Sequence, residues 1–142
     1  MTQKLVNGQL VDLTSEEEAA RTAEKSANFT ASKLPHLVAY REAKISAGIT
    51  VNGVKIKGDE KTVSRLGNAR IEASSNSNFT AKWSAENGSF TLTAAQIISL
   101  HTAGVNFINN CFNAFDTVKT DIDDYTTLAQ IEAAFDAAYE AL

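Results

Sequence analysis

The pattern of apolar and polar positions along the chain first changes near residue 14. Before it, the segment Lys4–Val11 has an Asn-Gly pair, Asn7-Gly8, between two short apolar stretches. Asn-Gly supplies the positive φ angles of a type I′ turn, so this segment is predicted to form a hairpin. After it, Thr14 and Glu17 have the spacing of a capping box, and three glutamates in the first turn complement the helix dipole. A helix is therefore predicted to begin here.

This first helix is poor in large apolar residues. Most of its apolar positions are alanines, and Phe29 is the only large apolar residue before Leu34. Such a helix has little apolar surface to bury against a core, so we expect it to form a polar arm. Pro35 suits the first position of a helix, and Gly48 suits a helix stop. The sequence therefore predicts a break before Pro35 and a second helix that ends near Ala47.

Three further elements are predicted between residues 49 and 93. The alternation of apolar and polar residues around a second Asn-Gly pair predicts another hairpin. A short helix and a polar loop follow, and Phe79, Ala81 and Trp83 then alternate on one face of a strand. The predicted ranges are a hairpin at 49–57, a helix from about 60 to 73, a loop at 74–78, and a third hairpin with strands at 79–83 and 89–93.

The C-terminal third has the strongest helical pattern. Thr93 and Gln96 form another capping box, and a long helix is predicted from Ala94 to about Lys119. Thr127 and Gln130 then cap a last helix. The long helix has an apolar seam with alternating spacings of four and three residues, at Ile97, His101, Gly104, Ile108, Cys111, Phe115, Val118 and Ile122.

Together these elements predict an α+β fold. It consists of an N-terminal polar helical arm and small β-hairpins packed with a long C-terminal helical hairpin. We expect two parts: residues 1–33, an N-terminal hairpin and arm helix that serve as a docking segment, and residues 34–142, a compact α+β domain.

Composition and charge then restrict the function. A chain of 142 residues with 44% hydrophobic residues can build one core without disulfides. The net charge is 13 − 17 = −4, which disfavours a dedicated nucleic-acid binder. We see no apolar run long enough to span a membrane and no secretory leader, so we expect synthesis in a cytoplasm and no membrane partner.

Candidate chemistry is sparse. His36 and His101 do not have metal-ligand spacing, so a metal site within one protomer would need distant carboxylates, and a trimer axis could gather three copies of His101. Cys111 lies within an apolar helix face and is interpreted as a buried thiol. The acidic turn at 121–124 lacks the glycine and the closing glutamate of a calcium loop, and is interpreted as a capping turn. We therefore predict no catalytic, cofactor-binding or metal-binding residues, no cofactor, and no enzyme activity.

Two features suggest a binding surface. The first is a basic cluster that could bind nucleic acid if Trp83 or Tyr40 stacked bases; the alternative is a solvated face balanced by Glu60, Glu72 and the acidic arm. The second is the set of unpaired hairpin edges, which a partner strand could extend or helices of a closed domain could cover. The sequence leaves both alternatives open. The basic cluster consists of Lys55, Lys57, Lys61, Arg65 and Arg70.

The order of motifs from residue 40 to about 125 resembles a domain of unknown function in tail proteins of tailed bacteriophages and prophages. Members are often labelled tail fibre or tail fibre assembly proteins. The resemblance implies a non-enzymatic structural protein of the virion tail, fibre-associated or a connector, synthesised in the host bacterial cytoplasm. It also implies other tail or fibre proteins as partners and a homo-oligomer, with a trimer as one candidate. It transfers no site residues. The motifs are Arg41, Gly48–Val54, Thr62–Leu66, Trp83, Glu86–Thr93 and Gln96-Ile97.

Two other functions stay open. One is a tail fibre assembly chaperone that is absent from the mature virion. We expect a connector to need copies of itself or its neighbours to cover the apolar stripe around Phe107, Phe112 and Phe115, whereas a chaperone could be a monomer or dimer. The other is a small lytic or carbohydrate-active enzyme. It would need a carboxylate pair such as Glu72 or Glu86 with Asp116, and no spacing supports one.

Overall fold

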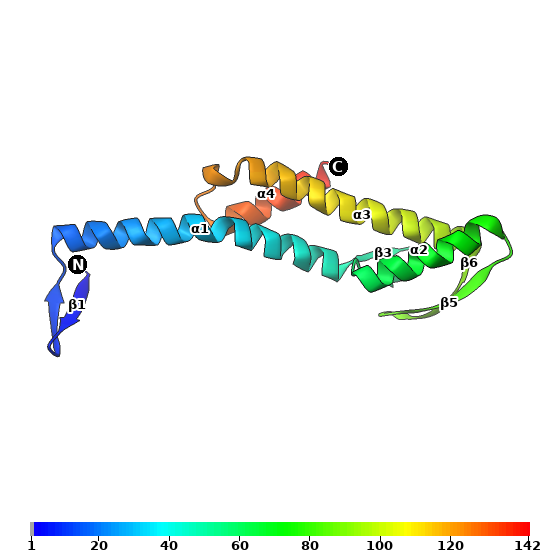
Figure 1. Cartoon of the computed structure of the whole chain (residues 1–142), viewed down its shortest axis with the longest axis horizontal. Coiled ribbons are helices and arrows are strands. Elements are labelled where there is room, and N and C mark those ends of the chain that lie inside the picture. Colours follow the sequence, from blue (N-terminus) through cyan, green and yellow to red (C-terminus); the bar gives the residue numbers. More distant parts are fainter. Residues whose placement is uncertain (1) are drawn as a thin grey trace.

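A computed structural model describes residues 2–142 as an elongated α+β fold (Figure 1). Over these residues, four α-helices form most of the molecule, and the strands form three separate two-stranded antiparallel sheets. The predicted fold class is confirmed. The elements are β1 (Gln3–Val6), β2 (Gln9–Asp12), α1 (Ser15–Ala47), β3 (Ile49–Val51), β4 (Val54–Ile56), α2 (Glu60–Ser75), β5 (Thr80–Ala85), β6 (Gly88–Thr93), α3 (Ala94–Thr120), the 3-10 helix η1 (Ile122–Asp124) and α4 (Leu128–Glu140).

Helix α1 is continuous, so the predicted break before Pro35 is wrong. The capping box is present at its start: the Glu17 N–H donates to Thr14 Oγ1 at 3.2 Å, and the Thr14 N–H donates to Glu17 Oε2 at 2.9 Å. Pro35 removes one backbone donor within the helix, but Pro35 and Ala31 are both exposed, so water can reach the carbonyl that loses its partner. Buried residues C-terminal to Pro35, such as Leu37, hold the helix in place by packing.

All three predicted hairpins are present. The first two turns have the positive φ angles that Asn-Gly pairs favour: 50° at Asn7, 82° at Gly8, 50° at Asn52 and 81° at Gly53. The third hairpin begins at Thr80 rather than at the predicted Phe79, and its strands extend further toward the turn, which has two residues, 86–87, because Ala85 pairs with Gly88.

The core has two clusters, which α3 links. One lies between α1, α3 and α4 and includes Leu37, Phe107, Cys111, Phe115 and Phe135. The other lies between α2, the small hairpins and the N-terminal half of α3, and includes Ile56, Leu66, Trp83, Leu92 and Ile97. Much of the predicted seam of α3 is therefore buried.

The apolar stripe around Phe107 is largely covered within one chain. Phe107 and Phe115 are buried, whereas Phe112 is exposed and lies beneath Arg41, whose guanidinium carbon is 4.5 Å from the ring centroid. Helices α1 and α4 supply the cover. The expectation that a connector needs further copies to cover this stripe therefore loses its basis.

The N-terminal part of α1 projects from the rest of the molecule and carries the hairpin β1–β2 at its far end (Figure 1). Residues 19–28 are all exposed. The first firm attachment is Lys33, which is buried and whose Nζ donates to the backbone oxygen of Asp123 at 3.3 Å. The division at residue 33 falls within a continuous helix and stays a prediction. No helix in residues 2–142 is both long and apolar enough to cross a membrane.

Candidate interaction surfaces

The N-terminal hairpin has two different faces. Because directly paired residues of an antiparallel ladder share a face, the pair Leu5 and Leu10 lies on one face, and the pair Lys4 and Val11 lies on the other. The Lys4 ammonium group pairs with the carboxylate of Glu17 at the start of α1. The Lys4 face is therefore held toward α1, and the leucine face points away from it.

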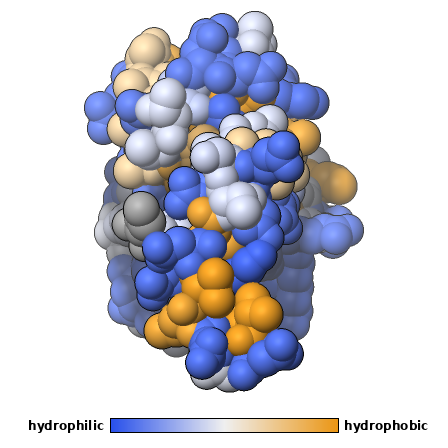
Figure 2. Space-filling model, turned by 90° about the vertical axis from the view of Figure 1, so that its left-hand side faces the viewer, coloured by the Kyte–Doolittle hydropathy of each residue, from blue (hydrophilic) through white to orange (hydrophobic). Residues whose placement is uncertain are grey.

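The leucine face is open to solvent. Leu5 and Leu10 are 70% and 69% exposed, and apolar atoms gather at the end of the molecule that the hairpin forms (Figure 2). A single two-stranded hairpin is marginally stable in water and gains stability from a third strand or a packed partner. Within residues 2–142, neither β1 nor β2 pairs with any further strand. The N-terminal hairpin is thus a candidate docking surface.

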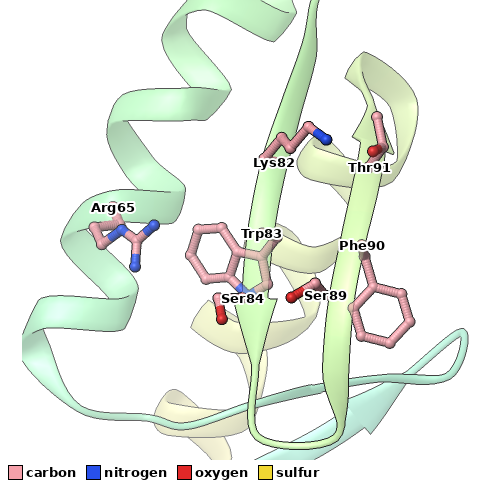
Figure 3. Close-up of a pocket in the computed structure, with 7 residues that line it drawn as sticks. All are labelled: Arg65, Lys82, Trp83, Ser84, Ser89, Phe90 and Thr91. Carbon is pink, nitrogen blue, oxygen red and sulfur yellow. The ribbon is translucent and has the colours of Figure 1, made fainter.

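A shallow groove lies at the opposite end of the molecule, along the hairpin β5–β6. It has a volume of about 230 Å³ and contains side chains from α2, β5 and β6. Arg65 reaches from α2 to the ring of Trp83 on β5, with its guanidinium carbon 4.7 Å from the ring centroid, and Phe90 lies on the neighbouring strand (Figure 3). The residues that line it are Arg65, Lys82, Trp83, Ser84, Ser89, Phe90 and Thr91.

A smaller pocket of about 90 Å³ adjoins this groove and shares Arg65, Trp83 and Ser84 with it. The smaller pocket also contains Lys55, Lys57 and Glu86. We call the two together the basic groove. Its charged lining residues are Lys55, Lys57, Arg65 and Lys82 against Glu86, which gives 4 − 1 = +3.

Glu86 is the counter-charge of two of these lysines. Its Oε1 lies 2.7 Å from Lys57 Nζ, and its Oε2 lies 2.9 Å from Lys55 Nζ. These hydrogen bonds, that of Lys57 first, lower the pKa of Glu86 to about 2, and Glu86 in turn raises the pKa of Lys57. Lys55 and Lys57 therefore pair with Glu86 and not with the predicted counter-charges Glu60 and Glu72. A carboxyl group with so low a pKa is also unsuited to act as a general acid near neutral pH.

Arg65 and Lys82 keep free charges, since neither forms an ion pair within residues 2–142.

The structure does not support the base stacking on which the nucleic-acid hypothesis depends. Trp83 is only 6% exposed and lies beneath Arg65, and Tyr40 belongs to the other core cluster. Neither ring is free to stack a base.

Asn87 connects two hairpins in a way that the sequence did not indicate. Its Oδ1 accepts from the Lys55 N–H at 3.1 Å, and its Nδ2 donates to the Gly53 carbonyl at 2.8 Å. The turn of the third hairpin is thereby tied to the second hairpin. From the sequence alone, Asn87 predicts only a turn.

The histidines and the cysteine lie in structural surroundings. His36 Nε2 is 2.9 Å from Glu132 Oε1 on α4, and His101 lies near Gly67 of α2, where burial lowers its pKa and Arg70 adds to the effect. Cys111 is buried, as predicted, and burial raises its pKa. Residues 2–142 contain no group of three or more His, Cys, Asp or Glu placed to hold a metal ion. The acidic turn predicted at 121–124 forms η1.

Comparison with known proteins gives a family for this chain. Residues 13–139 match the family described as the domain of unknown function DUF4376. The match runs from the residue after β2 to the last turn of α4, so it includes the basic groove and leaves out both strands of the N-terminal hairpin. Neither the curated proteins nor the solved structures gave a match to the chain. Because the matched residues make up most of its length, the chain belongs to the DUF4376 family.

Proposed function

We propose that this protein is a non-enzymatic structural component of a bacteriophage tail, fibre-associated or a connector, that docks to neighbouring tail proteins. The observation that carries the proposal is the projection of an exposed apolar hairpin away from a separately packed body by an exposed polar helix. The resemblance of residues 40–125 to a phage tail domain supplies the biological setting. Synthesis in the bacterial cytoplasm and a final place in the virion tail belong to the same proposal.

The arm is suited to reach a neighbour. A helix rises 1.5 Å per residue, so the 33 residues of α1 span about 50 Å. Residues 19–28 are all exposed. Such a helix holds the hairpin at a distance without adding an apolar surface of its own, and a partner that covers Leu5 and Leu10 would stabilise the hairpin.

An assembly chaperone remains the second candidate, and one observation favours it. Phe107 and Phe115 are covered within the chain, so a single copy does not need partners to bury these two rings. A chaperone could therefore be a free monomer that binds a fibre during assembly and then leaves.

Mass spectrometry of purified phage particles separates the two candidates. A structural component should be present at several copies per particle, measured against a capsid protein of known copy number. Absence from particles, despite expression during infection, would overturn the structural role and favour the chaperone.

A matched pair of variants tests the docking surface in the same particles. Leu5→Ser/Leu10→Ser should reduce the copy number at least about tenfold, because it removes the exposed apolar pair. Ile71→Ser is the control, since Ile71 is also 70% exposed but lies on α2. Equal copy numbers for both variants and the natural chain would show that the hairpin does not dock.

A further inference from the structure

We infer that the acidic end of one copy docks into the basic groove of a second copy, head to tail. The acidic end is residues 2–18, in which Lys4 stands against Asp12, Glu16, Glu17 and Glu18, so its side-chain charge is 1 − 4 = −3. This inference deepens the proposed function and rests on it only in treating the N-terminal hairpin as a docking element. It names a second copy as the partner of that hairpin.

Charge complementarity is the first argument. The acidic end has a charge of −3, and the basic groove has a charge of +3 although the whole chain is at −4. Opposite local potentials steer two molecules of like net charge into one orientation. Self-association of two such chains is therefore directed to these two surfaces.

Both surfaces keep charges that nothing within residues 2–142 neutralises. At the acidic end, Glu17 pairs with Lys4, which leaves Asp12, Glu16 and Glu18 without an ion pair. In the groove, Glu86 pairs with Lys55 and Lys57, which leaves Arg65 and Lys82. The acidic end thus has three free carboxylates and the groove has two free cations, and the two sets are opposite in sign.

The size and chemistry of the groove also fit a hairpin. Its two parts, of about 230 and 90 Å³, are each smaller than the usual range for a drug-sized ligand and suit a few inserted side chains. Its half-buried Phe90 offers apolar surface to Leu5 or Leu10 in the groove that Arg65 and Lys82 also line. A nucleic acid fits less well, because the Trp83 ring is covered.

The shape of the molecule requires a second copy. The hairpin and the groove lie at opposite ends of an elongated chain, and α1 separates them (Figure 1). One chain cannot place its own hairpin in its own groove without breaking that helix. Contacts between different surfaces of identical copies are heterologous, so they build rings or filaments, as a tail connector would need.

Sedimentation velocity on the purified full chain tests the inference. At about 100 μM protein we expect species larger than a monomer in about 20 mM salt and monomers in about 500 mM salt, where charges are screened within a few ångströms. Arg65→Glu/Lys82→Glu and Glu16→Lys/Glu18→Lys should each weaken association at least about tenfold. An equimolar mixture of these two variants should associate again, because the unchanged acidic end of the first fits the unchanged groove of the second and the two reversed surfaces also match in charge.

Lys25→Glu/Lys119→Glu is the control, since it changes the net charge as much as Arg65→Glu/Lys82→Glu does, outside both surfaces. A natural chain that stays monomeric at low salt overturns the inference, and so does association that survives both charge reversals. Circular dichroism checks the fold of each variant, and the salt dependence of the natural chain needs no variant. Because this experiment uses the isolated chain and the tail assignment is tested in particles, either can fail alone.

Discussion

Gly48 shows how one residue can determine a junction. It ends α1 at φ 71°, and a Cβ there would lie 1.9 Å from the backbone oxygen of Ile56. We predict that Gly48→Ala destabilises the protein by about 3 kcal/mol or more, because left-handed strain adds to a clash with backbone that must move. Chemical denaturation measures this change.

Gly53 provides the control for that prediction. Its φ is 81°, but a Cβ there meets nothing within 4 Å. Gly53→Ala should therefore lose only the conformational part, about 1 to 2 kcal/mol. Equal losses at the two glycines would contradict the role of the contact with Ile56.

Tyr40 gives a prediction for alkaline pH. Its hydroxyl donates to Asp136 Oδ2 at 2.8 Å, and this bond, followed by burial, raises the pKa of Tyr40 to about 12 from a usual 10.0. The neutral phenol is thus the form that the fold favours. Its contribution is complete below the unfolded pKa of 10.0 and is lost as the pH rises through about 12.

We therefore expect the free energy of unfolding to fall between these two pH values, and Tyr40→Phe to remove part of that fall. The pKa values of Tyr125 and Tyr139 are raised as well, so some slope should remain. Ultraviolet titration of the phenolates should lose its step near 12 in Tyr40→Phe but not in Tyr125→Phe. A Tyr40 step at the usual pKa would contradict the hydrogen bond.

At the scale of elements, the second and third hairpins act together through Asn87. We predict that Asn87→Ala destabilises the protein by about 1 to 2 kcal/mol, because two hydrogen bonds to the backbone of the second hairpin are lost. Amide exchange at Lys55 should accelerate in this variant and measures the effect directly. Asn68→Ala on α2 is a control, since this exposed residue makes no hydrogen bond of this kind within residues 2–142. Unchanged exchange at Lys55 would show that the hairpins are independent.

Elements also show where the sequence was insufficient. Pro35 and Gly48 are both helix-ending signals, yet only Gly48 ends a helix. Tertiary packing explains the difference. Leu37, two residues after Pro35, is fully buried in the cluster between α1, α3 and α4, whereas Gly48 lies directly against Ile56. Packing therefore overrides the helix-breaking effect of Pro35, which is worth a few kcal/mol, because water can bind the carbonyl that loses its partner.

At the scale of the whole molecule, the arm and the body should be separable. We predict that removing residues 1–25 leaves the thermal unfolding midpoint of the body nearly unchanged, because residues 19–28 are exposed and Lys33 stays attached to Asp123. The same truncation should abolish self-association. Differential scanning calorimetry and sedimentation on one sample measure both. A body that no longer folds would make the arm part of the core.

The sequence by itself determined the features that depend on neighbouring residues. The capping boxes at Thr14 and Thr93, the Asn-Gly turns at 7–8 and 52–53, and the apolar seam of α3 all follow from interactions within a few residues or one helical face. Their physical causes are local hydrogen bonds, allowed φ angles and side-chain periodicity, so they can be derived without the rest of the chain.

Only the tertiary structure decided which distant residues meet. It placed Glu86 rather than Glu60 or Glu72 between Lys55 and Lys57, put Arg65 over Trp83, and covered Phe107 with α1 and α4. It also separated the acidic end from the basic groove along the length of α1 (Figure 1). These pairings depend on how helices and hairpins pack across long sequence separations, and no local propensity encodes such distances.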